Sequence, residues 1–215
     1  TNPVTVSVDS NMTITANFAI NTYTLTVNAV NGTVTKSPDQ TVYNHGTSVQ
    51  LTAVPSTGYH FVDWTGAITG STNPVTVSVD SNMTITANFV INTYTLTVNA
   101  VNGTVTKSPD QATYNHGTSV QLMAAPSTGY HFVDWTGDLT GSTNPANITM
   151  DGNKTITANF AINIYTLTVN AVNGTVTKNP DQPTYNHGTS VQLTAAPSTG
   201  YHFVDWAGNL TGSTN

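Results

Sequence analysis

Residues 23–34 read YTLTVNAVNGTV, and the same letters return at 94–105 and at 165–176. From Tyr23 to Ala29 every second side chain is apolar, and the side chains between them are polar. Alternation with a period of two predicts a β-strand with one face buried and one face in water. Each repeat is therefore expected to begin with a strand, and no part of the chain shows the periodicity of a helix.

The Asn31-Gly32 pair stands between this strand and a second alternating run. Asn-Gly in such a position is typical of a two-residue hairpin, because a type I′ turn needs positive φ at both central residues. We therefore expect a hairpin in which Ala29 lies opposite Val34, with both side chains directed toward the same core.

The remainder of the first repeat holds further strand signals separated by turns. Residues 48–53 alternate, and residues 59–64 form the most aromatic segment. Trp64 is one residue out of phase with the other aromatic side chains of its segment, which indicates a bulge or a strand end. Residues 75–79 and 83–89 also alternate, and the Asp-Ser-Asn turn between them predicts a second hairpin.

The repeat has a period of 71 residues, as the spacing of Tyr23, Tyr94 and Tyr165 shows. A period of this length is typical of a small module copied in tandem. Complete modules are predicted at residues 23–89 and 94–160. Each is expected to contain about six short strands, which makes the fold class all-β: tandem small β-sheet modules.

Two further pieces flank the complete modules. Residues 1–18 return at 72–89, so they correspond to the C-terminal hairpin of a module. Residues 165–215 correspond to a module that lacks this last hairpin. The sequence therefore suggests a slice of a longer array whose two ends are complementary.

Four-residue linkers join the modules at 19–22, 90–93 and 161–164. They contain neither Gly nor Pro and continue the strand alternation, although the inward phase shifts from even to odd residue numbers. Short linkers without flexible residues predict modules that are held stiffly and turned relative to their neighbours. We expect the array to be a rod.

Charged residues make up 7% of the chain, and ten Asp against four Lys give a net charge of −6. Such a weak acidic field lacks the clustered cations that bind nucleic acid or anionic membranes, so neither partner is expected. No apolar run approaches the length of a membrane span, so we expect no membrane insertion in this segment. Cysteine is absent.

Six short motifs occur in the same order in both complete modules, with one residue changed in each of two motifs of the second module. In the first repeat they are YTLTV at 23–27, NGTV at 31–34, YNHG at 43–46, VQLTA at 49–53, GYHFVDWTG at 58–66 and MTITANF at 83–89. This ordered set resembles the divergent InlB B-repeat family, which is related to the Listeria–Bacteroides repeat. The resemblance covers the whole chain.

The resemblance implies a β-grasp-like module in secreted or surface-anchored proteins of bacteria or archaea, often in long arrays. No catalytic residue is assigned to such repeats, so none is carried over. The chain departs from the family pattern before its tryptophans, where Asp63, Asp134 and Asp205 replace the usual Gly. The resemblance therefore does not predict the conformation of the turn at these positions.

Neither a metal site nor a catalytic site is predicted. His45 and His60 are fifteen residues apart, and with no Cys this spacing does not match a zinc site. The Asp-Ser-Asn turn lacks the ligand spacing of an EF-hand loop and is explained by turn capping. The few acids give no convergent pair for hydrolysis, and no nucleophile elbow is present. We expect no enzymatic activity and no cofactor.

Asn-X-Thr sequons mark candidate glycan acceptors, most of them at predicted turns. Their number matches what the Asn, Ser and Thr content produces by chance, so the count itself is not evidence for glycans. The acceptors are Asn11, Asn31, Asn82, Asn102, Asn147, Asn153, Asn173 and Asn209.

The aromatic segment of each repeat offers two interpretations. Its rings could stack on sugars, or they could fill the core, and a module this small needs its large side chains inside. The candidate stacking residues are Tyr59, Trp64, Tyr130, Trp135, Tyr201 and Trp206.

These observations favour an extracellular structural protein that serves as stalk, spacer or filament body. The complementary ends suggest self-assembly, with neighbouring copies of the chain as head-to-tail partners. The alternative is an adhesin or carbohydrate-binding array, whose partners are surface glycans or host or matrix proteins and whose avidity comes from repetition. In both cases the expected location is extracellular or at the cell surface.

Overall fold

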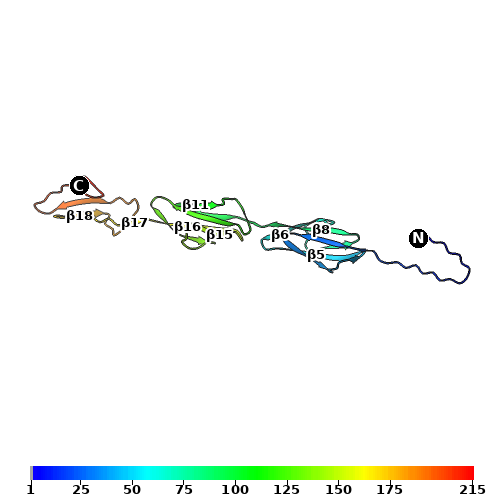
Figure 1. Cartoon of the computed structure of the whole chain (residues 1–215). Helices are drawn as coiled ribbons and strands as arrows, with labels where there is room; N and C mark the ends of the chain where they lie inside the picture. Colours follow the sequence, from blue (N-terminus) through cyan, green and yellow to red (C-terminus); the bar gives the residue numbers. More distant parts are fainter. Residues whose placement is uncertain (1) are drawn as a thin grey trace. The chain divides into compact units, whose positions relative to one another are not determined.

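The computed structural model describes residues 2–215, so the first residue of the predicted 1–18 hairpin lies outside the described part. The chain divides into one compact unit that ends at Asn92 and a second that spans Thr93–Asn215. The described residues contain strands and no helix, which confirms an all-β fold built from small sheets in tandem (Figure 1).

The first module contains six strands of five or more residues and two of two residues. In chain order these are β1 (Thr22–Tyr23), β2 (Leu25–Ala29), β3 (Gly32–Ser37), β4 (Tyr43–Asn44), β5 (Thr47–Pro55), β6 (Tyr59–Gly66), β7 (Val75–Val79) and β8 (Met83–Ile91).

The six longer strands form two three-stranded sheets, in the orders β2-β8-β6 and β3-β5-β7, and β1 pairs with β4. Strand β8 is central in its sheet: it runs parallel to β2 and antiparallel to β6. Strand β5 is central in the other sheet and antiparallel to both neighbours. The resemblance implied a β-grasp-like module, and the strands instead divide between two sheets that share one core.

The predicted hairpin at Asn31-Gly32 is wrong. Strands β2 and β3 belong to different sheets, so Ala29 pairs with Ala87 rather than with Val34. Asn31 has φ 64°, but Gly32 is outside the positive-φ region, so the connection is not a type I′ turn. Both Ala29 and Val34 nevertheless pack against the same core, from opposite sheets.

The predicted hairpin of residues 75–79 and 83–89 is wrong for the same reason. Strand β7 pairs with β5, and β8 pairs with β2 and β6, so the chain crosses between sheets at this turn. Alternation shows which side chains face a core. In a sandwich both sheets face the same core, and so alternation alone cannot tell which strands are paired.

The core of the first module lies between its two sheets. It contains the fully buried side chains of Tyr43, Leu51, Trp64 and Ile85, each at most 1% exposed. The bulge expected near Trp64 is confirmed, because the register of β6 against β8 shifts between Phe61 and Asp63. The extra residue turns Trp64 inward, in phase with the core.

The second module repeats this topology and has its own core. Its strands are β9 (Thr93–Tyr94), β10 (Leu96–Ala100), β11 (Gly103–Ser108), β12 (Tyr114–Asn115), β13 (Ser119–Pro126), β14 (Tyr130–Gly137), β15 (Ala146–Thr149) and β16 (Lys154–Ile162). Strands β8 and β16 run into the linkers as far as Ile91 and Ile162, as the continued alternation predicted.

Residues 165–215 keep part of the fold. Their strands are β17 (Ile164–Tyr165), β18 (Gly174–Asn179), β19 (Tyr185–Asn186) and β20 (Gln192–Pro197). Residues 167–171 and most of 201–208, which correspond to β2 and β6, are not strands. In the complete modules these strands flank β8, and no segment of 165–215 corresponds to β8.

Residues 2–18 form no strand and are exposed. They do not form the hairpin predicted for this segment, because they have no partner strands within the first unit.

Candidate functional sites

The tryptophans predicted as stacking residues lie in the cores of the complete modules. Trp64 and Trp135 are each 1% exposed, and their indole N–H groups donate to the carbonyls of Thr72 and Thr143 at 2.9 Å. Each ring also packs against a phenylalanine of its own strand, with Phe61 and Trp64 centroids 5.1 Å apart. These two rings have no free face for a sugar.

The other candidate stacking residues are more accessible. Tyr59 and Tyr130 are half-buried, and Tyr201 is 57% exposed. Trp206 is half-buried, although it has the same indole hydrogen bond, to the Thr214 carbonyl, as its two counterparts. Sugar stacking stays a prediction, and it now rests on the tyrosines.

All eight candidate glycan acceptors belong to exposed residues. The side-chain oxygens of Asn82 and Asn153 accept the backbone N–H of Thr24 and Thr95 at 2.9 Å, so both residues also cap the start of a strand. These hydrogen bonds use only the side-chain oxygens of Asn82 and Asn153 and not the side-chain nitrogens, to which a glycan would be attached. Glycosylation stays a prediction that the exposure of these residues permits.

Charged side chains form short ion pairs at the surface. In each module one lysine pairs with an aspartate three residues later, as Lys36 does with Asp39 at 2.9 Å. The hydrogen bond to Asp39 raises the pKa of Lys36 above its ordinary value, against a smaller opposing effect of burial. The hydrogen bond from Lys154 lowers the pKa of the exposed Asp151. These pairs are solvated and contribute little to stability.

Among residues 2–215, no three His or Asp side chains gather as a metal ion would require. His45 and His60 contact the two linkers that flank the module. The backbone N–H of His45 donates to the Asn21 carbonyl in the linker before it, whereas the ring of His60 contacts Asn92 in the linker after it. Both histidines therefore interact with linker asparagines, a role that the sequence analysis did not identify.

The linker residue Asn163 joins the second and third modules. Its backbone N–H donates to the Gly129 carbonyl at 2.8 Å, and its own carbonyl accepts the N–H of His187 at 2.8 Å. Its side-chain oxygen lies 2.8 Å from Nδ1 of His131. One residue thus bonds to the turn before β14 in one module and to the turn after β19 in the next.

Gly129 makes close contact at this junction possible. It has φ +84°, and a Cβ at this position would overlap the ring of His187. Gly200, the equivalent residue of the third module, has φ +86° and no atom within 4 Å of that place. Gly129 is therefore covered by a neighbouring module, whereas Gly200 is not.

Both halves of this contact recur in the first unit. The Asn92 N–H donates to the Gly58 carbonyl at 2.8 Å, and the Asn21 carbonyl accepts the His45 N–H at 2.8 Å. The sequence signal that could have revealed the junction is the Ile-Asn pair present in all three linkers.

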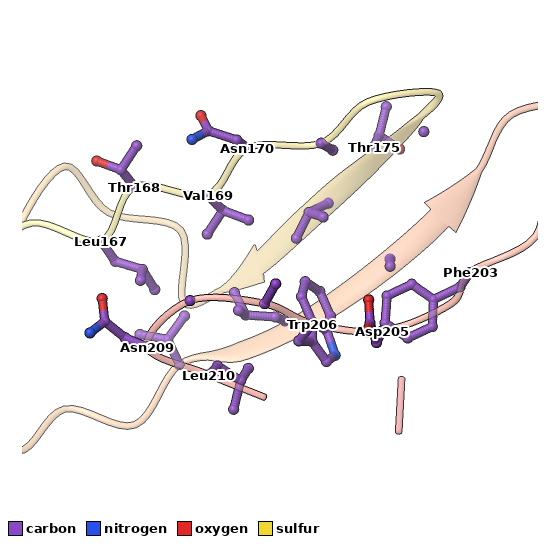
Figure 2. Close-up of a pocket in the computed structure, with 18 of the residues that line it drawn as sticks. Leu167, Thr168, Val169, Asn170, Thr175, Phe203, Asp205, Trp206, Asn209 and Leu210 are labelled. Atoms are coloured by element: carbon purple, nitrogen blue, oxygen red, sulfur yellow. The ribbon is translucent and has the colours of Figure 1, made fainter. Parts of the chain in front are cut away.

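A groove of about 890 Å³ opens in residues 165–215. Figure 2 shows Leu167 and Val169 pointing toward Trp206 and Leu210, whereas Thr168 and Asn170 point away. In the first module the space between the equivalent segments holds strand β8. The groove therefore corresponds to the place that β8 occupies in the first module.

Comparison with known families agrees with the repeat structure. The family model of the divergent InlB B-repeat domain matches residues 23–93, 94–164 and 165–215. The chain belongs to the divergent InlB B-repeat family. These B-repeats begin at the same three tyrosines that open the predicted modules. No curated protein matches the chain.

Repeats of this type are typically surface-associated, and the tandem B-repeats indicate a surface repeat protein. The described residues contain no helix long and apolar enough to cross a membrane.

The departure of this B-repeat chain from the family pattern is accommodated by the bulge in β6. Asp63 follows the bulge and is outside the positive-φ region, so a glycine is not required there. Its carboxylate instead accepts a hydrogen bond from the Asn88 side chain at 2.7 Å.

Proposed function

We propose that this B-repeat chain is an extracellular structural protein that acts as a stalk, spacer or filament body and has no catalytic role. The observation that carries the proposal is the Asn163 junction, because a spacer must hold its modules in a defined relation. Hydrogen bonds from one linker residue to both neighbouring modules restrict the hinge that a free linker would leave.

The burial of the large rings supports the same function. Trp64 and Trp135 stabilise their modules from inside, which leaves them unavailable to a ligand. The alternative of an adhesin or carbohydrate-binding array rests on the tyrosines alone. Surface glycans and matrix proteins therefore stay predicted partners.

The expected dimensions follow from compactness. A B-repeat of this size has a radius of gyration of about 11 Å, so each repeat of a rod adds roughly 30–40 Å of length. The rod stays a prediction. Its test is whether the junction holds neighbouring modules at one distance.

Double electron–electron resonance measures this distance directly, and the absence of native Cys makes labelling specific. Spin labels at Thr104→Cys and Thr175→Cys occupy equivalent exposed positions of neighbouring modules. We expect a single narrow distance distribution. Gly129→Ala should broaden it, because the new methyl group displaces His187.

Gly200→Ala is the matched control. It introduces the same strain of a side chain at positive φ but meets no neighbouring atom, so the distribution should stay narrow. A broad distribution in the unmutated background would mean a flexible linker and would contradict the spacer function.

A further inference from the structure

In the first module the strand nearest the incoming linker and the strand that leads to the outgoing linker lie side by side. Strand β2 follows the incoming linker, and β8 runs into the outgoing one. The two strands are parallel, with five residue pairs from Leu25↔Met83 to Ala29↔Ala87. Tension along the chain therefore pulls β2 toward its N-terminal end and β8 toward its C-terminal end, in opposite directions along a common axis.

Parallel strands that are pulled in this way are loaded in shear. The hydrogen bonds of a parallel ladder are evenly spaced, so they share the load and must break together. Two strands that are pulled apart at the same end are instead peeled open, one bond after another. Because each backbone hydrogen bond is weak by itself, the number of bonds that share the load decides how much force the ladder resists.

Further hydrogen bonds extend this ladder beyond the start of β2. The Thr24 carbonyl accepts the backbone N–H of Met83 at 3.0 Å. The Asn82 side-chain oxygen accepts both the backbone N–H and the hydroxyl of Thr24, at 2.9 and 3.2 Å. These bonds join the residue before β2 to the start of β8, so they bear the same load as the ladder.

The neighbours of the two strands oppose sliding as well. Leu25 of β2 and Ile85 of β8 are 5% and 0% exposed, so sliding would bring apolar side chains into water. Strand β8 is also paired with β6 on its other side, and so it cannot follow β2 without breaking a second ladder. Within this sheet β2 pairs with β8 alone, which makes their contact the link that holds the incoming chain.

We propose that the parallel β2–β8 ladder is a mechanical clamp, through which each complete module bears tension without unfolding. The second module has the same arrangement, with β10 parallel to β16 over five residue pairs. There the Asn153 side-chain oxygen accepts the backbone N–H of Thr95 at 2.9 Å. The inference rests on the proposed function as a stalk, because only a tethered array carries load, and it adds resistance to force to the setting of distance.

Optical tweezers can load the first module of the full chain in two directions. The absence of native Cys allows DNA handles to be attached at two chosen residues. Thr22→Cys with Val90→Cys loads β2 and β8 at opposite ends, which is shear. Thr22→Cys with Ser81→Cys loads the same two strands at the same end, which peels them apart. All three positions are exposed, so the handles do not enter the core.

We expect the first module to unfold at a force at least about twofold higher in shear than in peeling, because the bonds of the ladder then break together. The two double variants should have equal thermal stability, so that the difference in force reports the direction of loading. Equal forces in the two directions, or a higher force in peeling, would overturn the proposal.

A matched pair of core substitutions locates the clamp. Val27→Ala removes two methyl groups from β2, whereas Val75→Ala removes the same groups from β7, which belongs to the other sheet. Both valines are half-buried and pack against the same core, so the two variants should lose similar stability to chemical denaturation. In shear, only Val27→Ala should lower the unfolding force. An equal loss of force in both variants would place the resistance in the core as a whole and would contradict the clamp.

The spacer function is tested separately, by the distance between the second and third modules. A narrow distance distribution together with equal forces in shear and peeling would refute the clamp alone. A broad distribution together with a high force in shear would refute the spacer function alone.

Discussion

At Gly32 the missing side chain leaves space for the ring of Phe89, which closes one end of the core in the first module. The second module repeats the arrangement with Gly103 and Phe160. Gly32 is therefore required by close approach and not by its φ angle. The NGTV motif combines this glycine with the positive φ of Asn31, so that the chain can turn from one sheet to the other.

Gly32→Ala should destabilise the first module. The added methyl group overlaps the ring of Phe89, and overpacking of this kind costs about 1–3 kcal/mol. Chemical denaturation followed by amide signals of the first module measures the change in free energy of unfolding. Gly152→Ala is the control, because its methyl group meets nothing within 4 Å and its φ is outside the positive range. Equal stability of the two variants would contradict this packing.

At the scale of elements, β8 connects the most distant parts of the module. It pairs in parallel with β2, so that Leu25 lies beside Met83. It also pairs with β6 on its other side. A central strand has both edges hydrogen-bonded, whereas β2 and β6 each pair with only one strand of this sheet. Residues 165–215 include no counterpart of β8, and residues 167–171, the counterpart of β2, are not a strand.

The rates of amide hydrogen exchange should follow this difference in strand pairing. We expect the hydrogen-bonded backbone amides of β8 and β16 to exchange at least about a thousandfold more slowly than the amides of residues 167–171. Residues 167–171 have no neighbouring strand to accept their hydrogen bonds. Exchange monitored by two-dimensional NMR gives the rates residue by residue. Comparable protection in residues 167–171 would show that these residues find a strand partner within the free chain.

At the largest scale, residues 165–215 form the least complete folding unit within the described part of the chain. It keeps β18 paired with β20 and the buried Tyr185, but its other core side chains are only half covered. Each apolar side chain left in water forgoes about 1.5–3 kcal/mol of burial. Within residues 2–215 the two complete modules are therefore the more stable part.

Thermal unfolding should proceed in at least two steps. We expect the indole N–H signal of Trp206 to disappear at a temperature at least ~10 °C below those of Trp64 and Trp135. The three signals can be followed in one NMR sample, which makes the buried pair an internal control. A single transition for all three would mean that the modules unfold as one cooperative unit.

The local sequence pattern predicted many of the strands and the direction of their side chains. The alternation at residues 48–53 predicted strand β5, in which Val49 and Leu51 are fully buried, and the phase of Trp64 predicted the bulge in β6. These inferences succeeded because the side-chain direction of a strand depends only on residues close in sequence. The pairing of strands failed as a prediction, because β2 meets β8 across 58 residues and no local signal encodes a parallel partner.

The amino-acid sequence by itself determined the strands, the inward faces, the repeat and the family, since each depends on short-range order that the repeats display several times. Only the tertiary structure decided that neighbouring strands cross between two sheets, that Asn163 bonds to two modules, and that residues 165–215 leave a strand-shaped groove. These features arise from contacts between distant segments, where burial of a shared core and satisfaction of backbone hydrogen bonds select one pairing among several that the alternation allows.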